Sequence, residues 1–167
     1  IIMSSPLNIG TNKKTGVSVD GKYTAAKWLT FTGDFNFGMF SREGEYESEN
    51  FDFTGDQWEG KFTTKFKLPA DIDFEFTGRH HSAVETFQGE RTAYSTADLG
   101  IRKKMMNGKL VLNVSVRDLF ESQKWENYVY DPDYTSFSSY QRGRFFKVGL
   151  SYGFGKGEAM YYYGGKR

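Results

Sequence analysis

The chain has 167 residues, enough for one domain but too few for several. Its 22 Lys and Arg residues nearly balance its 21 Asp and Glu residues, so the basic excess of nucleic-acid-binding proteins is missing and no nucleic-acid partner is expected. The absence of Cys excludes a disulfide framework and Cys-ligated metal sites. Aromatic residues make up 18% of the chain beside 19 Gly, a composition that favours strands and turns over helices.

Hydropathy excludes one kind of membrane protein and leaves another open. The mean hydropathy is −0.63, and no stretch approaches the ~18 consecutive apolar residues that a transmembrane helix needs. A transmembrane β-barrel stays open, because its strands alternate apolar and polar residues and their hydropathy averages out. The start of the chain, residues 1–5, lacks the charged and apolar regions of a signal peptide, so we expect a mature or internal portion if the protein is exported.

Seven segments alternate apolar and polar residues with a period of two, the pattern of strands with one apolar face. In chain order they are 17–23, 29–39, 58–68, 72–77, 97–102, 110–117 and 146–154. Residues 1–14 precede the first of them. The pattern predicts an all-β protein of seven antiparallel strands.

The connections between these segments alternate between short and long. Tight turns are expected at 24–27, 69–71 and 107–108, and long loops at 41–57, 80–93 and 118–141. All turns then lie at one end of the sheet and all loops at the other, which is the polarity of an outer-membrane barrel. About ten residues at ~3.3 Å each, tilted by about 45°, rise ~23 Å, close to the ~25 Å apolar band of such barrels. We therefore predict a transmembrane up-and-down β-barrel, with a soluble β-sandwich as the competing fold.

In such a barrel the apolar face contacts lipid and the polar face lines the lumen. The expected lipid-facing residues are Phe31, Phe35, Phe37, Phe62, Phe66, Phe74, Leu112, Val114, Val148 and Leu150. The expected lumen-facing charges are Asp34, Glu59, Lys61, Lys65, Asp73, Glu75, Asp98 and Arg102. Two aromatic girdles are expected, with Tyr23, Trp28, Tyr152 and Phe154 on the turn side and Phe40, Trp58 and Phe146 on the loop side. Seven strands cannot close the usual even-numbered barrel, so a further strand is expected upstream.

Six short motifs carry a resemblance to a known family. They are Pro6-Leu7-Asn8-Ile9-Gly10, Phe66-Lys67-Leu68-Pro69, Ala97-Asp98-Leu99-Gly100-Ile101-Arg102-Lys103, Asn107-Gly108-Lys109-Leu110, Val116-Arg117-Asp118-Leu119-Phe120 and Val148-Gly149-Leu150-Ser151-Tyr152-Gly153-Phe154-Gly155-Lys156. In this order and spacing, the chain resembles the C-terminal part of TonB-dependent outer-membrane receptors, in the branch described as outer-membrane β-barrel family proteins. The resemblance implies a barrel of about twenty-two strands with an N-terminal plug, of which this chain would supply the last third.

The resemblance also implies a function and a set of partners. It implies uptake of a nutrient of the siderophore, glycan or peptide class by a multi-pass receptor in the outer membrane of a Gram-negative bacterium. The TonB system would act through the plug, which lies outside this chain. The lipid bilayer and the barrel-assembly machinery are further partners, and a surface lipoprotein is a candidate lid. The alternative that stays open is a complete small eight-stranded barrel with a structural or adhesion role.

The last alternating segment is expected to have a second role besides spanning the membrane. Its apolar residues are Phe146, Val148, Leu150, Tyr152 and Phe154, and we predict that they form the terminal strand and the signal read by the barrel-assembly machinery. This strand must find a partner before it enters hydrocarbon, since unsatisfied edge groups are costly there. We expect it to pair with 110–116. Residues 1–156 would then belong to the barrel and 157–167 would form a short tail.

No enzyme activity and no cofactor are expected from the sequence. His80 and His81 with Glu85 suggest a metal site, but adjacent residues of an extended segment point to opposite faces, which favours a structural role. Residues 153–157 resemble a Gly-rich phosphate loop, yet no helix pattern follows them. These motifs therefore predict no catalytic or metal chemistry.

Paired carboxylates and loop aromatics are the remaining candidates. Asp73 and Glu75 could perform acid–base chemistry, but Lys61, Lys65 and Lys67 on the neighbouring strand favour a charge ladder. The long loop 118–141 carries the rings of Trp125, Tyr128, Tyr130, Tyr134 and Tyr140, which can stack on sugars, aromatic chelators or a partner protein. Packing of one loop on another is an equal alternative for these rings.

Overall fold

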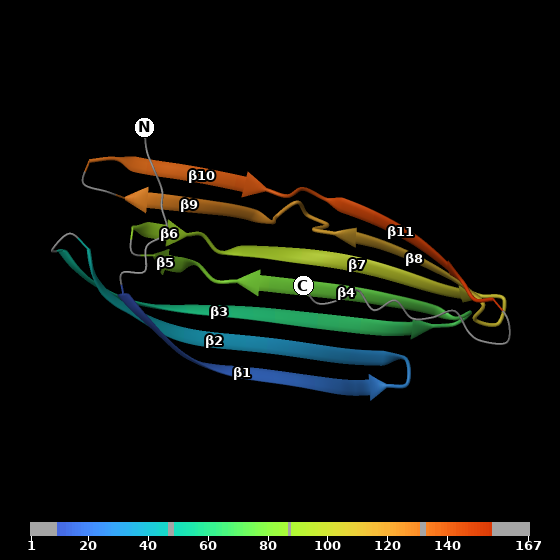
Figure 1. The fold of residues 1–167 in the computed structure, drawn as a ribbon. Coiled ribbons are helices and arrows are strands. Elements are labelled where there is room, and N and C mark those ends of the chain that lie inside the picture. The colour runs from blue at the N-terminus through green and yellow to red at the C-terminus, as the bar shows by residue number, and fades with distance from the viewer. Residues whose placement is uncertain (1–9, 47–48, 87, 131–132, 155–167) are drawn as a thin grey trace.

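The computed structural model describes residues 10–154, apart from 47–48, 87 and 131–132. These residues form eleven strands and two antiparallel sheets (Figure 1). One sheet has seven strands in the order β1-β2-β3-β4-β7-β8-β11, and the other has four in the order β10-β9-β6-β5. Within this part of the chain, no helical segment has the length and apolarity needed to cross a bilayer.

The seven-stranded sheet contains every strand that the alternation predicted. Its strands are β1 (Gly10–Ala26), β2 (Leu29–Tyr46), β3 (Glu49–Leu68), β4 (Ile72–His81), β7 (Tyr94–Met105), β8 (Leu110–Arg117) and β11 (Phe145–Tyr152). The predicted pairing of the last strand is confirmed, because β11 pairs with β8 along its whole length. The two edges are β1 and β11, and the sheet is not closed by the residues that the structure describes.

The three short connections lie together at one end of this sheet, at the right in Figure 1, as predicted. The last of them spans residues 106–109 and so includes the predicted Asn107-Gly108 turn. Met106 and Asn107 have φ values of 55° and 54°, and the N–H of Gly108 donates to the carbonyl oxygen of Met105 at 3.1 Å. Gly108 also has a positive φ, of 84°, and the strands pair again at Met105 and Leu110, so the connection is a four-residue loop and not a two-residue turn.

The long connections at the opposite end are not irregular loops, which corrects the prediction. Residues 41–57 continue β2 and β3 as one paired ribbon out to Tyr46 and Glu49. The other two connections contain β5 (Val84–Thr86), β6 (Gly89–Arg91), β9 (Lys124–Tyr130) and β10 (Thr135–Gln141). The hairpin β5–β6 joins the hairpin β9–β10 through the β6–β9 pair, so their backbone groups satisfy one another in the four-stranded sheet.

The first and the last strand differ in extent from the predicted segments. The first strand begins at Gly10 and not after residue 14, because Gly10–Lys14 pair with the extended β2. The last strand ends at Tyr152, since the N–H of Gly153 already bonds to Lys109 in the turn. Phe154 lies beyond the strand and is 88% exposed. The predicted tail and its boundary at 156 and 157 lie outside the described residues.

The pairing register gives the seven-stranded sheet one apolar and one polar face. All ten residues predicted to face lipid lie on the same face. The register across the sheet shows this, because residues that pair directly point to the same side and the side alternates along each strand. This face is poorly covered within the described residues: Phe62 is 50% exposed and Leu150 67%. An apolar surface of this extent is stable only against nonpolar surroundings.

One predicted girdle residue lies on the other face. Phe40 pairs with Gly55 on the polar side of the sheet, and its ring contacts that of Phe53 with a centroid distance of 5.7 Å. A Cβ added to Gly55 would come within 2.6 Å of the Phe40 ring. Phe40 therefore fills the space above Gly55 instead of joining Trp58 at the loop-side girdle.

Candidate functional site

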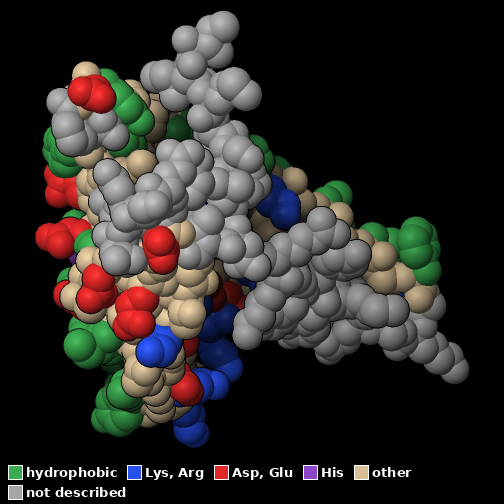
Figure 2. Space-filling model, turned by 60° about the vertical axis from the view of Figure 1, so that its left-hand side comes forward, with side chains coloured by type: hydrophobic (Ala, Val, Ile, Leu, Met, Phe, Trp, Pro, Cys, Tyr) green, Lys and Arg blue, Asp and Glu red, His purple; other side chains and the backbone are tan. Residues whose placement is uncertain are grey.

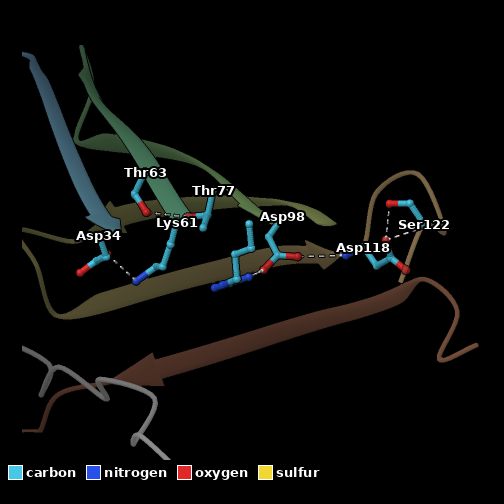
Figure 3. A network of polar contacts seen from close by, with 8 residues as sticks. Asp34, Lys61, Thr63, Thr77, Asp98, Asp118 and Ser122 are labelled. Atoms are coloured by element: carbon cyan, nitrogen blue, oxygen red, sulfur yellow. Dashed lines mark hydrogen bonds and ion pairs between the residues drawn. The ribbon is translucent and has the colours of Figure 1, made fainter. Parts of the chain in front are cut away.

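The charges predicted for the lumen share the polar face of the seven-stranded sheet. In register these are Asp34, Glu59, Lys61, Lys65, Asp73, Glu75, Asp98 and Arg102. The Nζ atom of Lys61 lies 3.7 Å from Oδ2 of Asp34, a pair visible in Figure 3, and Lys65 Nζ lies 3.4 Å from Glu75 Oε2. Exposed pairs of this kind contribute about 0–1 kcal/mol each, so they give the face its polarity and register more than its stability.

Asp118 is a buried aspartate at the loop end of this face, and the sequence analysis did not predict it as a site residue. Asp118 is only 1% exposed. Its Oδ1 accepts hydrogen bonds from the backbone N–H of Ser122 at 2.9 Å and from its hydroxyl at 3.2 Å, and its Oδ2 accepts from the N–H of Gln123 at 3.0 Å. With φ at 51°, Asp118 closes the turn that leads from β8 to β9. The one feature of the sequence that pointed to Asp118 was its position in the motif 116–120, which contributes to the family resemblance.

Asp98 links this turn to the charged face. Its Oδ1 accepts from the N–H of Asp118 at 3.0 Å, and its Oδ2 is paired with the guanidinium of Arg79. Figure 3 shows Asp98 and Asp118 side by side, with Ser122 on the turn beyond them. The N–H of Leu119 also donates to the carbonyl oxygen of Ala97 at 2.7 Å. The turn is therefore held against β7 by both side-chain and backbone bonds.

The two adjacent histidines point to opposite faces, as the alternation predicted. His80 lies on the apolar face, where Nδ1 is 2.8 Å from Ser95 Oγ and the ring packs 4.6 Å from that of Trp58. His81 lies on the polar face, with Nδ1 3.3 Å from Glu59 Oε2. Among the described residues no group of three or more His, Asp or Glu side chains is placed to hold a metal ion.

The loop aromatics are divided between the two faces of the β9–β10 hairpin. On one face the ring of Trp125 stacks on that of Tyr140 at 5.6 Å and meets Tyr94 edge-on at 5.5 Å. On the other face Tyr128 contacts Tyr130 at 6.3 Å. Tyr134 lies beside the hairpin tip and is 41% exposed. Only Trp125 and Tyr140 are therefore brought toward the polar face of the seven-stranded sheet.

Acidic side chains gather on the left-hand side of the molecule as seen in Figure 2, and the β2–β3 ribbon includes Glu43, Glu45, Asp52 and Asp56. Glu43 and Asp52 are directly opposed on the ribbon, and Glu43 is also 3.9 Å from Lys13 Nζ. On β9 the ammonium group of Lys124 donates a hydrogen bond to the Glu126 carboxylate, which raises the pKa of Lys124 above its usual value. The loop end thus presents a mixed but largely acidic rim.

A hollow opens on the apolar face of the described sheet. It has a volume of about 770 Å³, and its apolar lining includes Gly33, Gly60 and Gly78 with the rings of Phe35 and Phe62. The glycines leave a depression between the rings because they carry no side chain. Since it opens on the apolar face, this hollow is not part of the polar surface that a hydrophilic ligand would cross.

An antiparallel sheet with one exposed apolar face, one charged face, and short turns at a single end defines the class of membrane β-barrel walls. A model of the Outer membrane protein beta-barrel family matches residues 1–152. The chain therefore belongs to this family, and the family implies an outer-membrane location. Comparisons with curated proteins and with solved structures found no match.

Proposed function

We propose that this chain is the C-terminal section of a larger outer-membrane barrel, of about twenty-two strands, that takes up a nutrient in a TonB-dependent manner. The nutrient belongs to the siderophore, glycan or peptide class, and the host is a Gram-negative bacterium. The TonB system acts through a plug that is not part of this chain, and a surface lipoprotein is a candidate partner. The protein binds and transports without catalysing a reaction.

The observation that carries the proposal is the open sheet with an exposed apolar face. The outer edges of β1 and β11 have no strand partner among the described residues. Unpaired backbone groups cost several kcal/mol each in hydrocarbon, so a membrane-inserted sheet of this kind requires further strands to close it. The odd number of strands in the described part of this sheet, seven, supports the same conclusion, since single-chain bacterial barrels have an even number.

The length of the loop-end hairpins supports a receptor over a minimal barrel. The strand β2 has 18 residues, which rise ~40 Å when tilted by about 45°, well beyond the ~25 Å apolar band. The β2–β3 ribbon and the four-stranded sheet therefore extend past the membrane on the loop side. Paired hairpins of this kind can form the rim over which a ligand enters the lumen.

Uptake measurements test the proposed function. Compounds that co-purify with the full-length protein would be identified by mass spectrometry, and their accumulation measured in cells that lack either this protein or TonB. We expect either deletion to reduce accumulation at least tenfold, because transport needs both the receptor and the energy source. Accumulation that persists without TonB would contradict the proposal. A native polypeptide near the 19.2 kDa of this chain would instead support the small eight-stranded barrel.

We also expect the terminal strand to act as the assembly signal. Replacing Leu150 and Tyr152 with Ser should reduce the folded protein in the outer membrane severalfold, because both residues lie on the apolar face of β11. The control Lys147→Ser changes the polar face of the same strand and should assemble normally. The amount of heat-modifiable folded protein in isolated outer membranes measures both. Deletion of 157–167 should be tolerated, and loss of assembly on that deletion alone would move the signal into the tail.

A further inference from the structure

A second cavity lies on the polar face, where the seven-stranded sheet meets the two hairpins. Its volume is about 260 Å³, the space of roughly nine water molecules at ~30 Å³ each. The residues that matter for its chemistry are Arg79, His81, Tyr94, Arg117, Arg142 and Phe145. They come from four strands and from the β10–β11 connection, so the cavity exists only in the folded sheet.

The positive charges of this cavity are not all neutralised within the described residues. Arg79 is paired with Asp98, and the oxygens of Asp118, the other carboxylate of the lining, are occupied by the turn. Arg117 and Arg142 form no ion pair with any residue that the structure describes, and both are exposed. Two guanidinium groups are therefore available to an anion that enters the cavity, and guanidinium binds carboxylates through paired N–H donors.

Aromatic rings form the wall beside these charges. The ring of Tyr94 stacks on His81 at 4.6 Å and meets Trp125 edge-on at 5.5 Å. Phe145 lies directly opposite Arg117 in the β8–β11 register. Tyr94 and Phe145 both line the cavity, so a flat ring that enters it can contact them while its acidic substituent reaches the guanidinium groups.

We propose that this cavity binds an aromatic carboxylate through Arg117 and Arg142, with the ring held against Tyr94 and Phe145. This rests on the proposed function, because it identifies the chemical group by which the transported nutrient is first held. The cavity volume limits the bound group to a single substituted ring, so a larger ligand would place only that part of itself here. The acidic rim around the hairpins disfavours anions that bind without such direct contacts.

Calorimetric titration of the full-length protein in detergent, at constant ionic strength, tests the proposal. The probes are benzoate, its uncharged analogue benzamide, and cyclohexanecarboxylate, which keeps the charge without the aromatic ring. We expect saturable benzoate binding, at least tenfold weaker binding of benzamide, and weaker binding of cyclohexanecarboxylate. Arg117→Gln and Arg142→Gln should each weaken benzoate binding at least tenfold, because each removes charge-assisted hydrogen bonds.

The matched control is Arg144→Gln. Arg144 lies in the same connection as Arg142, but it pairs with Glu121 at 3.8 Å and is not in the cavity lining, so benzoate affinity should not change. Equal affinity for benzoate and benzamide, or unchanged benzoate affinity in the Arg117→Gln variant, would overturn the proposal. The uptake assay is independent: benzoate binding can be lost while TonB-dependent uptake remains, and uptake can prove TonB-independent while benzoate still binds.

Discussion

Replacing Phe35 with Arg should lower the free energy of unfolding by about 2–4 kcal/mol, the cost of a cationic side chain at the middle of the lipid-facing surface of a barrel. Phe35 lies six residues above the start of β2, a rise of ~14 Å for a strand tilted by about 45°. This is near the centre of the ~25 Å apolar band. Urea unfolding of the full-length protein in phospholipid vesicles measures the change.

Two controls separate the cost of burying charge from the loss of the ring. Phe35→Leu removes the contact between the rings of Phe35 and Trp58, whose centroids lie 5.8 Å apart. The loss of unfolding free energy in this variant is subtracted from that in Phe35→Arg. Asn36→Arg places the same charge at the same depth on the polar face, where the Asn36 amide now donates to Glu59 at 3.2 Å. We expect this variant to change the free energy of unfolding by less than about 1 kcal/mol, because the new arginine and Glu59 both stay in contact with water. Equal losses for the two Arg variants would show that the faces are wrongly assigned.

Replacing Asp118 with Ala should open the β8–β9 turn, at a cost of about 3 kcal/mol. The change removes the acceptor of the N–H groups of Ser122 and Gln123, and a hydrogen bond to a charged group contributes about 1.5–3 kcal/mol. It also places Ala at a φ of 51°, which it adopts less readily than Asp. Amide hydrogen exchange in the turn should then be about a hundredfold faster, since ~1.4 kcal/mol corresponds to a factor of ten.

Asp118→Asn is the matched variant for this turn. It keeps one acceptor oxygen and tolerates positive φ, so its exchange should lie between that of the native protein and that of Asp118→Ala. Amides in the middle of β2 serve as the reference and should not change, because the turn contacts β7 and not β2. Native exchange rates at Ser122 in the Ala variant would contradict the role assigned to the buried carboxylate.

The sequence pattern did not predict that β2 and β3 continue as paired strands beyond the membrane band. Residues 41–57 are rich in charge and lack a consistent apolar face, so they read as a loop. In the structure they pair along the whole ribbon, since backbone hydrogen bonds need no particular side chains once the strands below are aligned. Phe40 lies on the polar face because β2 continues without a bulge past Met39, so its side chain points opposite to that of Met39 and lies above Gly55.

The sequence by itself determined the seven spanning strands, their two faces and the end at which the short turns lie, because alternation with a period of two is a local property of each segment. Only the tertiary structure decided that β6 pairs with β9, that Asp118 is buried against β7, and that Arg79, Arg117 and Arg142 surround one cavity. These arrangements depend on contacts between segments tens of residues apart in the sequence. The hydropathy pattern of a single strand cannot predict them, because it depends only on the residues of that strand.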